Sequence, residues 1–296
     1  MKRRNVVAIG AALAGVGLLP ELAQAASALK SSPRMPVLFV GHGSPMNAIT
    51  DNEFRRSWQA LGAEFGKAYP RPQLILCISA HWITPGSWRL TGMAQPRTIH
   101  DFGGFPQELF DQQYPAPGAP ATAREIASGT QPRLALDDHE WGYDHGTWSV
   151  LKPMFPKADI PVLQLSLDYA RPPQEHFALG EQLRGLREKG VLIVGSGNVV
   201  HNLRATRRDA NAMQAYDWAY EFDRWAGGVM AKGALKELSE FQKLGQVAQL
   251  AHPTYDHYLP LLHAAGAALP GEKVRFFNDR YQSASLAMRS VVWGGA

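Results

Sequence analysis

The sequence of 296 residues contains a single cysteine, Cys77. This excludes an internal disulfide and any metal site built from several thiolates. The longest apolar run, residues 6–19, is shorter than the roughly 20 residues that a bilayer-spanning helix needs. Charged residues make up only 19% of the chain and hydrophobic residues 45%, a composition that excludes bulk disorder. The chemistry must therefore use other side chains, and the ten histidines are the leading candidates.

Several familiar functional motifs are also missing. The chain has no HExxH zinc motif, no P-loop and no GxSxG elbow, and the segment 195–198 (GSGN) lacks the third glycine and the acidic residue of a dinucleotide site. There is also no long run of lysine and arginine. Three arginines lie within residues 204–208, which we interpret as a solvated helix face. We therefore expect no nucleic-acid partner.

The first 25 residues have the pattern of an export signal. Lys2, Arg3 and Arg4 form a basic start, the apolar run follows, and residues 23–25 (AQA) suit cleavage before Ala26. The pair of adjacent arginines suggests the twin-arginine route, and a buried N-terminal helix is the alternative interpretation. We expect an exported, periplasmic protein whose mature chain has no membrane span.

The remaining chain alternates short buried strands with amphipathic helices. Strands are expected at residues 36–40, 73–79, 161–167 and 191–194, with further strands within 273–278 and 286–293, and helices at 51–69, 119–128, 174–189 and 211–231. In the last helix Trp218, Phe222 and Trp225 recur at helical spacing, which is typical of core packing. The pattern predicts one three-layer α/β domain over residues 34–296. Its central sheet is expected to be mostly parallel or mixed, with helices on both faces.

Three histidines come just after predicted strands. His42 follows the strand at 36–40, His81 follows the strand at 73–79, and His201 follows the strand at 191–194 through a glycine-rich link. Ligand sites of open α/β sheets lie beyond the carboxyl ends of the strands. A lone histidine is more often structural, but three at the same topological position favour a shared metal site.

Two other segments place histidines among polar residues. His252 and His257 flank an aspartate, Asp256, so this segment offers a ligand together with a hydrogen-bond partner for it. Alternatively, the same segment caps the helix that follows. His145 lies in a stretch rich in glycine and aromatic residues, 144–148 (DHGTW). Histidine nitrogens without thiolate suit Fe(II), Zn(II), Cu(II) or Ni(II).

Seven segments then form a recognisable series. They are 41–45 (GHGSP), 79–82 (SAHW), 98–106 (TIHDFGGFP), 114–118 (YPAPG), 143–148 (YDHGTW), 195–203 (GSGNVVHNL) and 252–257 (HPTYDH). In this order they resemble the class III, LigB-type extradiol ring-cleavage dioxygenases, specifically the DOPA 4,5-dioxygenase-like branch. The resemblance covers nearly everything from residue 36 to the end.

The resemblance implies a fold, an activity and a site. It implies that a catechol-type, DOPA-like ring is opened with O2 at one histidine-bound metal and that both oxygen atoms enter the product. The implied metal-site residues are His42, His81, His201 and His257, and the implied catalytic residues are His145 and His201. Fe(II) is the expected ion for activity, and Zn(II) is a plausible bound ion.

The predicted substrate contacts are Ser44, Trp82, Phe102 and His252; core packing is the alternative interpretation of the aromatic residues. The sequence also departs from the family pattern at one point. The wider class completes its metal triad with a glutamate. Here the candidate is Glu240, whose surroundings indicate a solvated helix, so His257 is preferred. Because substrate and O2 need open metal positions, we expect either His201 or His257 to be bound loosely.

Two other functions remain open at this point. One is a zinc-dependent hydrolase on the same scaffold, since zinc activates water but does not reduce O2. The other is an exported protein that binds a metal or an aromatic compound without catalysis. The sequence makes no prediction of the oligomeric state.

Overall fold

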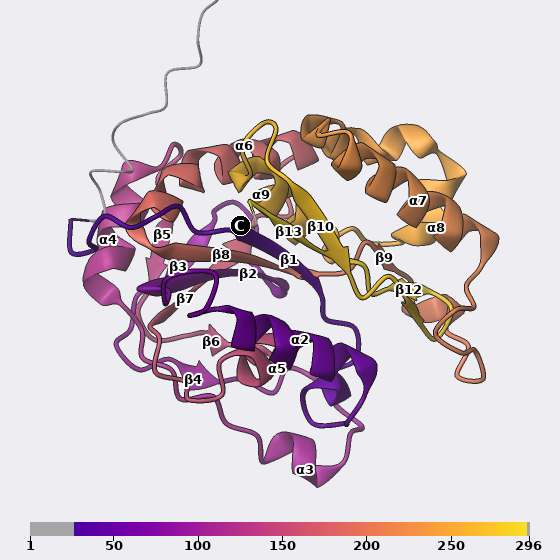
Figure 1. Cartoon of the computed structure of the whole chain (residues 1–296), viewed down its shortest axis with the longest axis horizontal. Helices are drawn as coiled ribbons and strands as arrows, with labels where there is room; N and C mark the ends of the chain where they lie inside the picture. Colours follow the sequence, from indigo (N-terminus) through magenta and orange to yellow (C-terminus); the bar gives the residue numbers. More distant parts are fainter. Residues whose placement is uncertain (1–26, 295–296) are drawn as a thin grey trace, which may run out of the picture.

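A mixed eight-stranded sheet forms the middle of the computed structural model, which describes residues 27–294 (Figure 1). In spatial order the strands are β10 (Val274–Phe277), β13 (Ser290–Trp293), β1 (Val37–Gly41), β8 (Val191–Gly197), β2 (Leu74–Ile83), β7 (Val162–Leu167), β3 (Arg89–Thr91) and β5 (Ala135–Asp137). The predicted export signal lies outside the described residues. Within them, no helix is both long and apolar enough to span a membrane.

The four central strands are parallel and nearly fully buried. Strand β1 pairs with β8, β8 with β2, and β2 with β7, all in the same direction. Because helices cover both faces, these strands read in the sequence as continuous apolar runs rather than as alternating patterns. The outer strands β13 and β3 run antiparallel to their inner neighbours. The predicted mixed sheet is confirmed.

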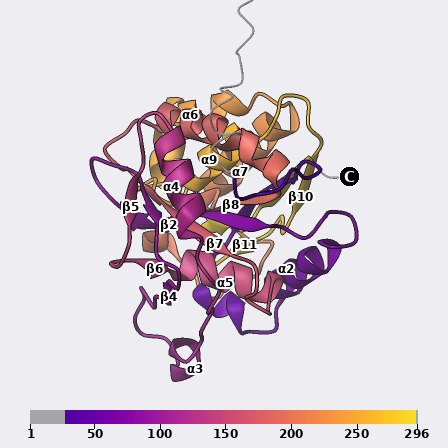
Figure 2. The same ribbon diagram turned by 90° about the vertical axis from the view of Figure 1, so that its left-hand side faces the viewer.

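Helices cover the two faces of the sheet and complete three layers (Figures 1 and 2). On one face lie α2 (Glu53–Glu64), α5 (His145–Met154) and the 3-10 helix η1 (Pro45–Ala48). On the other lie α6 (Pro173–Leu183), η2 (Arg184–Lys189), α7 (Asp217–Ala231), η4 (Leu235–Leu244), α8 (Gln246–Ala251) and α9 (Leu259–Ala267), while α4 (Pro120–Gly129) packs on β3 and β5. The aromatic positions predicted to be core are half-buried at Trp218 and Trp225 and fully buried at Phe222.

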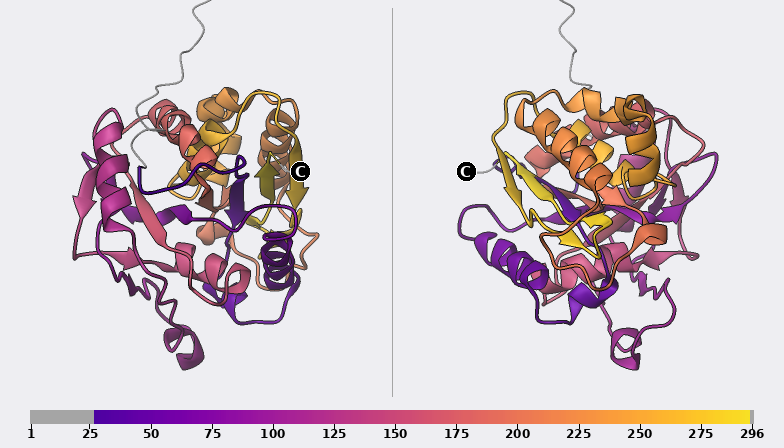
Figure 3. Two further views of the ribbon diagram at one scale, coloured as in Figure 1. Left: turned by 60° about the vertical axis from the view of Figure 1, so that its left-hand side comes forward. Right: turned by 90° about the vertical axis from the view of Figure 1, so that its right-hand side faces the viewer.

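Short elements surround the carboxyl edge of the parallel strands. One small sheet pairs β4 (Arg97–Thr98) with β6 (Gly142–Tyr143), and another contains β11 (Tyr281–Gln282), β12 (Leu286–Ala287) and β9 (Val200–His201). The short helix α3 (Gln107–Phe110) stands out from the body in every view (Figure 3). The segment 204–208 is not the helix face that we predicted. It forms the end of η3 (Leu203–Ala205) and an exposed loop.

Two glycines of the 195–198 segment serve close packing rather than nucleotide binding. A Cβ on Gly195 would lie 2.4 Å from the Pro260 carbonyl oxygen, and one on Gly197 would lie 2.1 Å from that of His257. Glycine is needed here because the start of α9 packs directly on the end of β8. This close approach brings His257 to the carboxyl edge of the sheet.

Candidate metal centre

Four histidines from four separate segments meet at the carboxyl edge of the parallel strands. His42 directly follows β1, His81 lies near the end of β2, His145 opens α5 and His257 precedes α9. The Nε2 atoms of His42 and His81 are 3.2 Å apart, and these two residues and His145 offer ring nitrogens that all lie within 4.8 Å of one another. The His257 ring centroid lies 5.2 Å from that of His42 and 4.9 Å from that of His81.

Hydrogen bonds fix which nitrogen of His42 faces the cluster. The Ser196 hydroxyl donates its single proton to the Gly146 carbonyl oxygen, so towards His42 it can only accept. The His42 Nδ1, at 3.0 Å from this oxygen, therefore carries the proton. Its Nε2 keeps a free lone pair on the side of His81, as a metal ligand requires.

Two carboxylates orient the other rings in the same way. Asp101 accepts hydrogen bonds from the backbone N–H of His145 at 2.8 Å and from its Nδ1 at 2.9 Å, and it lies 3.4 Å from Nδ1 of His81. Asp256 accepts from Nδ1 of His257. Since a carboxylate holds the proton on Nδ1, the Nε2 atoms of these rings keep a lone pair that can bind a metal or a proton.

Burial keeps the clustered rings neutral. It lowers the pKa of His42, His81 and His257 well below the ordinary histidine value, and the charges that the neighbouring rings would carry lower it further. The Asp101 carboxyl, in contrast, is held in its charged form. Burial would raise the pKa of its carboxyl, but hydrogen bonding and charge from His145 outweigh this and bring it down to about 2. His42, His81 and His257 thus present neutral imidazoles near an ionised carboxylate.

The donor set fits one divalent transition-metal ion. Two nitrogens that each bind the same ion at about 2.1 Å, with an angle of about 90° to 109° between the bonds, lie about 3.0 to 3.4 Å apart. The 3.2 Å separation of the His42 and His81 Nε2 atoms falls in this range. Without an ion, two lone pairs would face each other at this distance. His145 and His257 are the two side chains placed to add a third nitrogen.

His201 lies beside the cluster but stacks on His257. Their ring centroids are 3.4 Å apart with only 3° between the planes. A metal binds imidazole in the plane of the ring, so an ion in the plane of one ring lies about 3.4 Å from the plane of the other, well beyond a bond of about 2.1 Å. One ion therefore cannot bind both rings in this arrangement.

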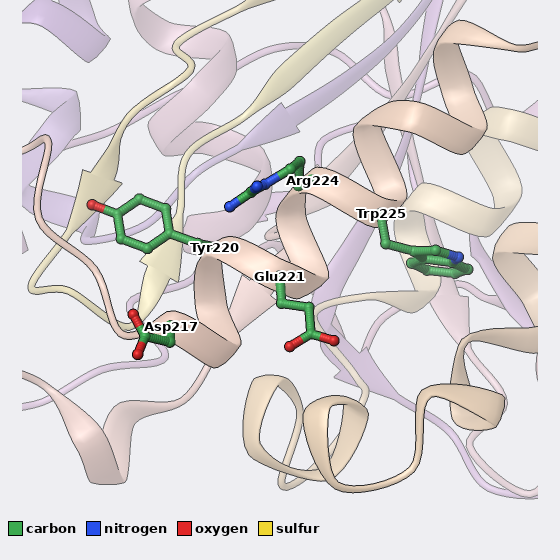
Figure 4. A pocket seen from close by; sticks show the side chains of 5 residues that line it. All are labelled: Asp217, Tyr220, Glu221, Arg224 and Trp225. Atoms are coloured by element: carbon green, nitrogen blue, oxygen red, sulfur yellow. The ribbon is translucent and has the colours of Figure 1, made fainter.

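A cavity of about 490 Å³ opens in front of the histidines. Its lining includes His42, His81, His145, His201, His257, Asp101, Ser44, Phe102, Phe105, Leu203, Thr206, Gln282, Ser283 and Leu286. A larger groove of about 600 Å³ on α7 has no histidine in its lining, which consists of Asp217, Tyr220, Glu221, Arg224 and Trp225 (Figure 4). The cavity of about 490 Å³ thus combines metal-binding nitrogens with an apolar wall that suits an aromatic ring of a ligand.

Comparison with known proteins identifies the family. Residues 35–292 match the family described as the catalytic LigB subunit of aromatic ring-opening dioxygenase. The chain belongs to this LigB family. It is 44% identical over 274 residues to the 4,5-DOPA dioxygenase extradiol of Escherichia coli (strain K12), a match covering 90% of this chain and 97% of that protein. A protein of the same name from Beta vulgaris is 34% identical over 259 residues, covering 85% and 94%.

A solved structure agrees with this assignment. The LigB-family chain superposes on the crystal structure of an uncharacterized protein from Escherichia coli K12 with a TM-score of 0.74 and 38% identity, covering 88% of this chain and 99% of that one. The predicted resemblance and enzyme class are confirmed: the chain is a metal-dependent extradiol dioxygenase that uses O2 to open an aromatic ring.

Two side chains predicted at the substrate point elsewhere in this LigB-family chain. Trp82 is buried against Trp141, with parallel rings 5.7 Å apart. Successive residues of a strand point to opposite sides, so a residue next to His81 must point away from the cavity. His252 is buried against Phe222 and Tyr258, and its Nε2 bonds the Val199 carbonyl oxygen at 2.8 Å. It is a core histidine.

The other predicted residues are placed as follows. Ser44 and Phe102 line the cavity, and Ser44 also caps η1 by accepting a hydrogen bond from the Met46 N–H. Glu240 is exposed and pairs with Lys243 far from the histidines, in agreement with the solvated helix expected there. The predicted cap of the helix after 252–257 is absent, because the Asp256 carboxylate is used by His257 instead.

Sequence reasoning missed the residues that hold the histidines in place. Asp101 stands in a segment that served only to recognise the family, although an acidic residue in a glycine-rich loop is itself a signal of function. Asp144 was also missed. Its buried carboxylate caps α5 and accepts hydrogen bonds from Ser79, Gln164 and Trp141. Nothing in the local sequence shows that these segments meet.

Proposed function

We propose that this dioxygenase opens the ring of a catechol with a DOPA-like side chain and that it uses an Fe(II) ion. The observation that carries the proposal is the pair of Nε2 atoms of His42 and His81, set at the spacing of two ligands of one ion. The relatives named 4,5-DOPA dioxygenase extradiol support the substrate class. A cavity of about 490 Å³ accommodates one ring with a short side chain.

We assign the metal to His42, His81 and His257. Asp256 holds the His257 ring by accepting from its Nδ1, and the Asn198 N–H holds the backbone by donating to the His257 carbonyl oxygen at 2.9 Å. His145 reaches the same point and also has a carboxylate partner, Asp101; the resemblance to the family implies an acid–base role for it, and we assign it to proton transfer. A ferrous ion held by these three histidines would supply open positions for the diol and O2 and the redox chemistry that links them.

The side chains around the ion then handle protons and exclude water. Nε2 of His145 takes a proton from the diol, and the Asp101 carboxylate stabilises the positive charge that results. His201, stacked on His257 at the cavity wall, is the second candidate base. Phe102 and Phe105 shield the ring from solvent.

Anaerobic reconstitution of the protein with Fe(II) tests this function. With a panel of catechols that includes DOPA, we expect uptake of one O2 per catechol and a coloured ring-opened product. His42→Ala and His81→Ala should abolish both metal binding and O2 uptake. Stoichiometric iron binding without O2 uptake on any catechol would contradict the proposal, and hydrolysis by the zinc-loaded protein would then favour the zinc hydrolase.

The choice of the third ligand has its own test. His257→Ala should lower the stoichiometry or affinity of bound Fe(II) or Zn(II), measured by equilibrium dialysis. His145→Ala should leave metal binding nearly unchanged and reduce kcat by about 100-fold or more, because it removes the acid–base group. The reverse pattern would make His145 the ligand and would overturn our assignment.

We also propose that the protein is exported and loses residues 1–25. The support is the sequence alone: a basic start, an apolar run and a small-residue cleavage site. Expression of the full chain in a Gram-negative host, followed by fractionation and N-terminal sequencing, should give a periplasmic product that begins at Ala26. A full-length product retained in the cytoplasm would contradict this proposal.

A further inference from the structure

One wall of the cavity, beside Gly43 and Ser44, is formed by a hairpin turn with an unusual backbone. Strands β11 and β12 are joined by residues 283–285, and β12 pairs with β9, the strand that carries His201. Ser283 and Ala284 both have left-handed backbones, with φ of +53° and +62°. This conformation is unfavourable for residues with a Cβ, and glycine would adopt it without strain.

Hydrogen bonds from a second loop hold this turn in place. The N–H groups of Asn202, Arg207 and Tyr216 donate to the carbonyl oxygens of Ser285, Ser283 and Ala284 at 3.1, 2.9 and 3.2 Å. Backbone strain of this kind persists where the surrounding structure over-determines the conformation, and it is concentrated at functional sites. The turn is therefore a rigid part of the cavity wall.

Three hydroxyl residues line the cavity, Ser44, Thr206 and Ser283. The Thr206 Oγ1 donates its proton to the Leu203 carbonyl oxygen. The Ser44 Oγ accepts a hydrogen bond from the Met46 N–H and keeps its own proton for another acceptor. Among the residues that the structure describes, Ser283 Oγ has no hydrogen-bond partner. The neighbouring Gln282 is already engaged, since its Oε1 accepts from the Ser44 N–H at 2.8 Å.

The charge near this hydroxyl favours an anionic group. Arg207, whose backbone is bonded to Ser283, lies in an exposed loop with Arg204 and Arg208, and Asp209 is the one acidic residue there. Lysine and arginine are absent from the cavity lining itself. A group at the rim of the cavity thus meets a free hydroxyl donor and a net positive loop, a combination that suits a carboxylate.

We propose that Ser283 is a specificity-determining residue that donates a hydrogen bond to a carboxylate on the side chain of the catechol. The inference rests on the proposed function, and it adds which end of the substrate is recognised and by what. The diol binds at the metal-binding histidines, and the turn that carries Ser283 contacts the side chain of the catechol. Catechols with a carboxylate should therefore be preferred over catechols of equal size without one.

Three variants at two adjacent positions test this proposal. Ser283→Ala removes the hydroxyl and keeps the strained backbone, Ser283→Gly removes both, and Ala284→Gly relieves strain but keeps the hydroxyl. The iron-loaded variants are assayed with 3-(3,4-dihydroxyphenyl)propionate and with 4-ethylcatechol, and thermal unfolding is recorded for each.

The expected result separates recognition from stability. Both Ser283 variants should lose about tenfold in kcat/KM for the propionate and less than about twofold for 4-ethylcatechol, as expected for one hydrogen bond to a charged group. Both glycine variants should have an unchanged or higher Tm, and Ala284→Gly should keep wild-type selectivity.

Two other outcomes are informative. If Ser283→Ala leaves the propionate-to-ethylcatechol ratio unchanged, or if Ala284→Gly changes it equally, Ser283 does not read the substituent and the inference is wrong. If the wild-type protein opens neither ring nor DOPA, the proposed function itself fails. The two failures are distinguishable because the first requires an active wild-type enzyme.

Discussion

Asp101 and Asp256 each serve a different histidine, and the difference can be measured at single residues. Asp101 bonds His145, which we assign to proton transfer, and Asp256 bonds His257, which we assign to the metal. Removing the carboxylate partner of a metal-site histidine typically costs about 10- to 100-fold in metal affinity or in activity. We expect the loss of activity to be larger for Asp101 and the loss of metal affinity to be larger for Asp256.

We therefore predict opposite phenotypes for the two asparagine variants. Asp101→Asn should lower kcat by about 10- to 100-fold, because the charge that stabilises protonated His145 is lost, and should weaken metal binding less than Asp256→Asn does, because Asp101 lies 3.4 Å from Nδ1 of the ligand His81. Asp256→Asn should weaken metal binding by a similar factor, measured by competition with a chelator. Equal loss of metal in both variants would contradict this division and would show that Asp101 supports the metal site, through His81 or His145, as strongly as Asp256 does.

At the residue scale the sequence predicted the histidines better than their surroundings. His42 directly follows β1, as predicted, whereas β2 runs to Ile83 and His81 lies within its last residues rather than after the predicted end at residue 79. Trp82 could not be placed correctly from its motif, since motifs do not state which side of a strand a residue occupies. The stack of His201 on His257 depends on two segments more than fifty residues apart, and no local pattern encodes it.

Helix α5 depends on one buried carboxylate for its position over β2 and β7 on one face of the sheet. Asp144 Oδ1 accepts from the Ser79 hydroxyl at 2.6 Å and from the Thr147 N–H at 3.2 Å. Its Oδ2 accepts from the side chains of Gln164 and Trp141. Burial, together with the charge of Asp101, raises the pKa of Asp144 to about 6. These bonds place the first turn of α5, and hence His145, at the site.

Asp144→Ala should consequently be one of the costlier single substitutions. It removes an N-cap, worth about 1 kcal/mol, and leaves several buried donors unpaired at about 1 to 3 kcal/mol each. We expect a loss of about 3 kcal/mol or more in the free energy of unfolding, measured with urea. Asn52→Ala, which removes the cap of α2, is the matched control and should cost only about 1 kcal/mol. Similar losses in both variants would contradict a special role for Asp144.

Among whole elements, those with a continuous apolar or amphipathic pattern were predictable. The four central strands and helices α2, α4 and α6 lie within or close to the ranges expected from the sequence. Helix α7 begins at Asp217, later than expected, because residues 211–216 are held as a loop by the strained turn. The strands β3, β5, β9, β11 and β12 have two or three residues each, too few for a periodic pattern, and tertiary pairing alone defines them.

Across the whole molecule, buried histidines outside the metal centre tie stability to pH. His176 on α6 and His263 on α9 face each other with ring centroids 5.0 Å apart, and both are fully buried. Burial lowers the pKa of His176 to about 4 and that of His263 well below the ordinary value. In the unfolded chain each titrates near 6.5.

The direction in which pH changes the free energy of unfolding follows from which state binds the proton. Between the folded and the unfolded pKa, the unfolded chain binds a proton and the folded chain does not, so stability falls as the pH drops below about 6.5. Each pH unit in this window costs about 1.4 kcal/mol per histidine. The loss from His176 ends near pH 4, at its folded pKa, and amounts to about 3 kcal/mol.

His263→Leu should remove part of this acid sensitivity. The substitution deletes a buried Nε2 that has no hydrogen-bond partner in the described residues and fills the space with an apolar side chain. Relative to the wild type, the variant should gain about 2 kcal/mol between pH 7.5 and pH 5, measured from urea unfolding at both values. The exposed His139 provides the control, because His139→Leu removes an imidazole that is in water in both states. Since the metal-centre histidines are present in every protein compared, their own titration cancels in the difference. An unchanged pH dependence in His263→Leu would show that the α6–α9 interface admits water or a proton at this position.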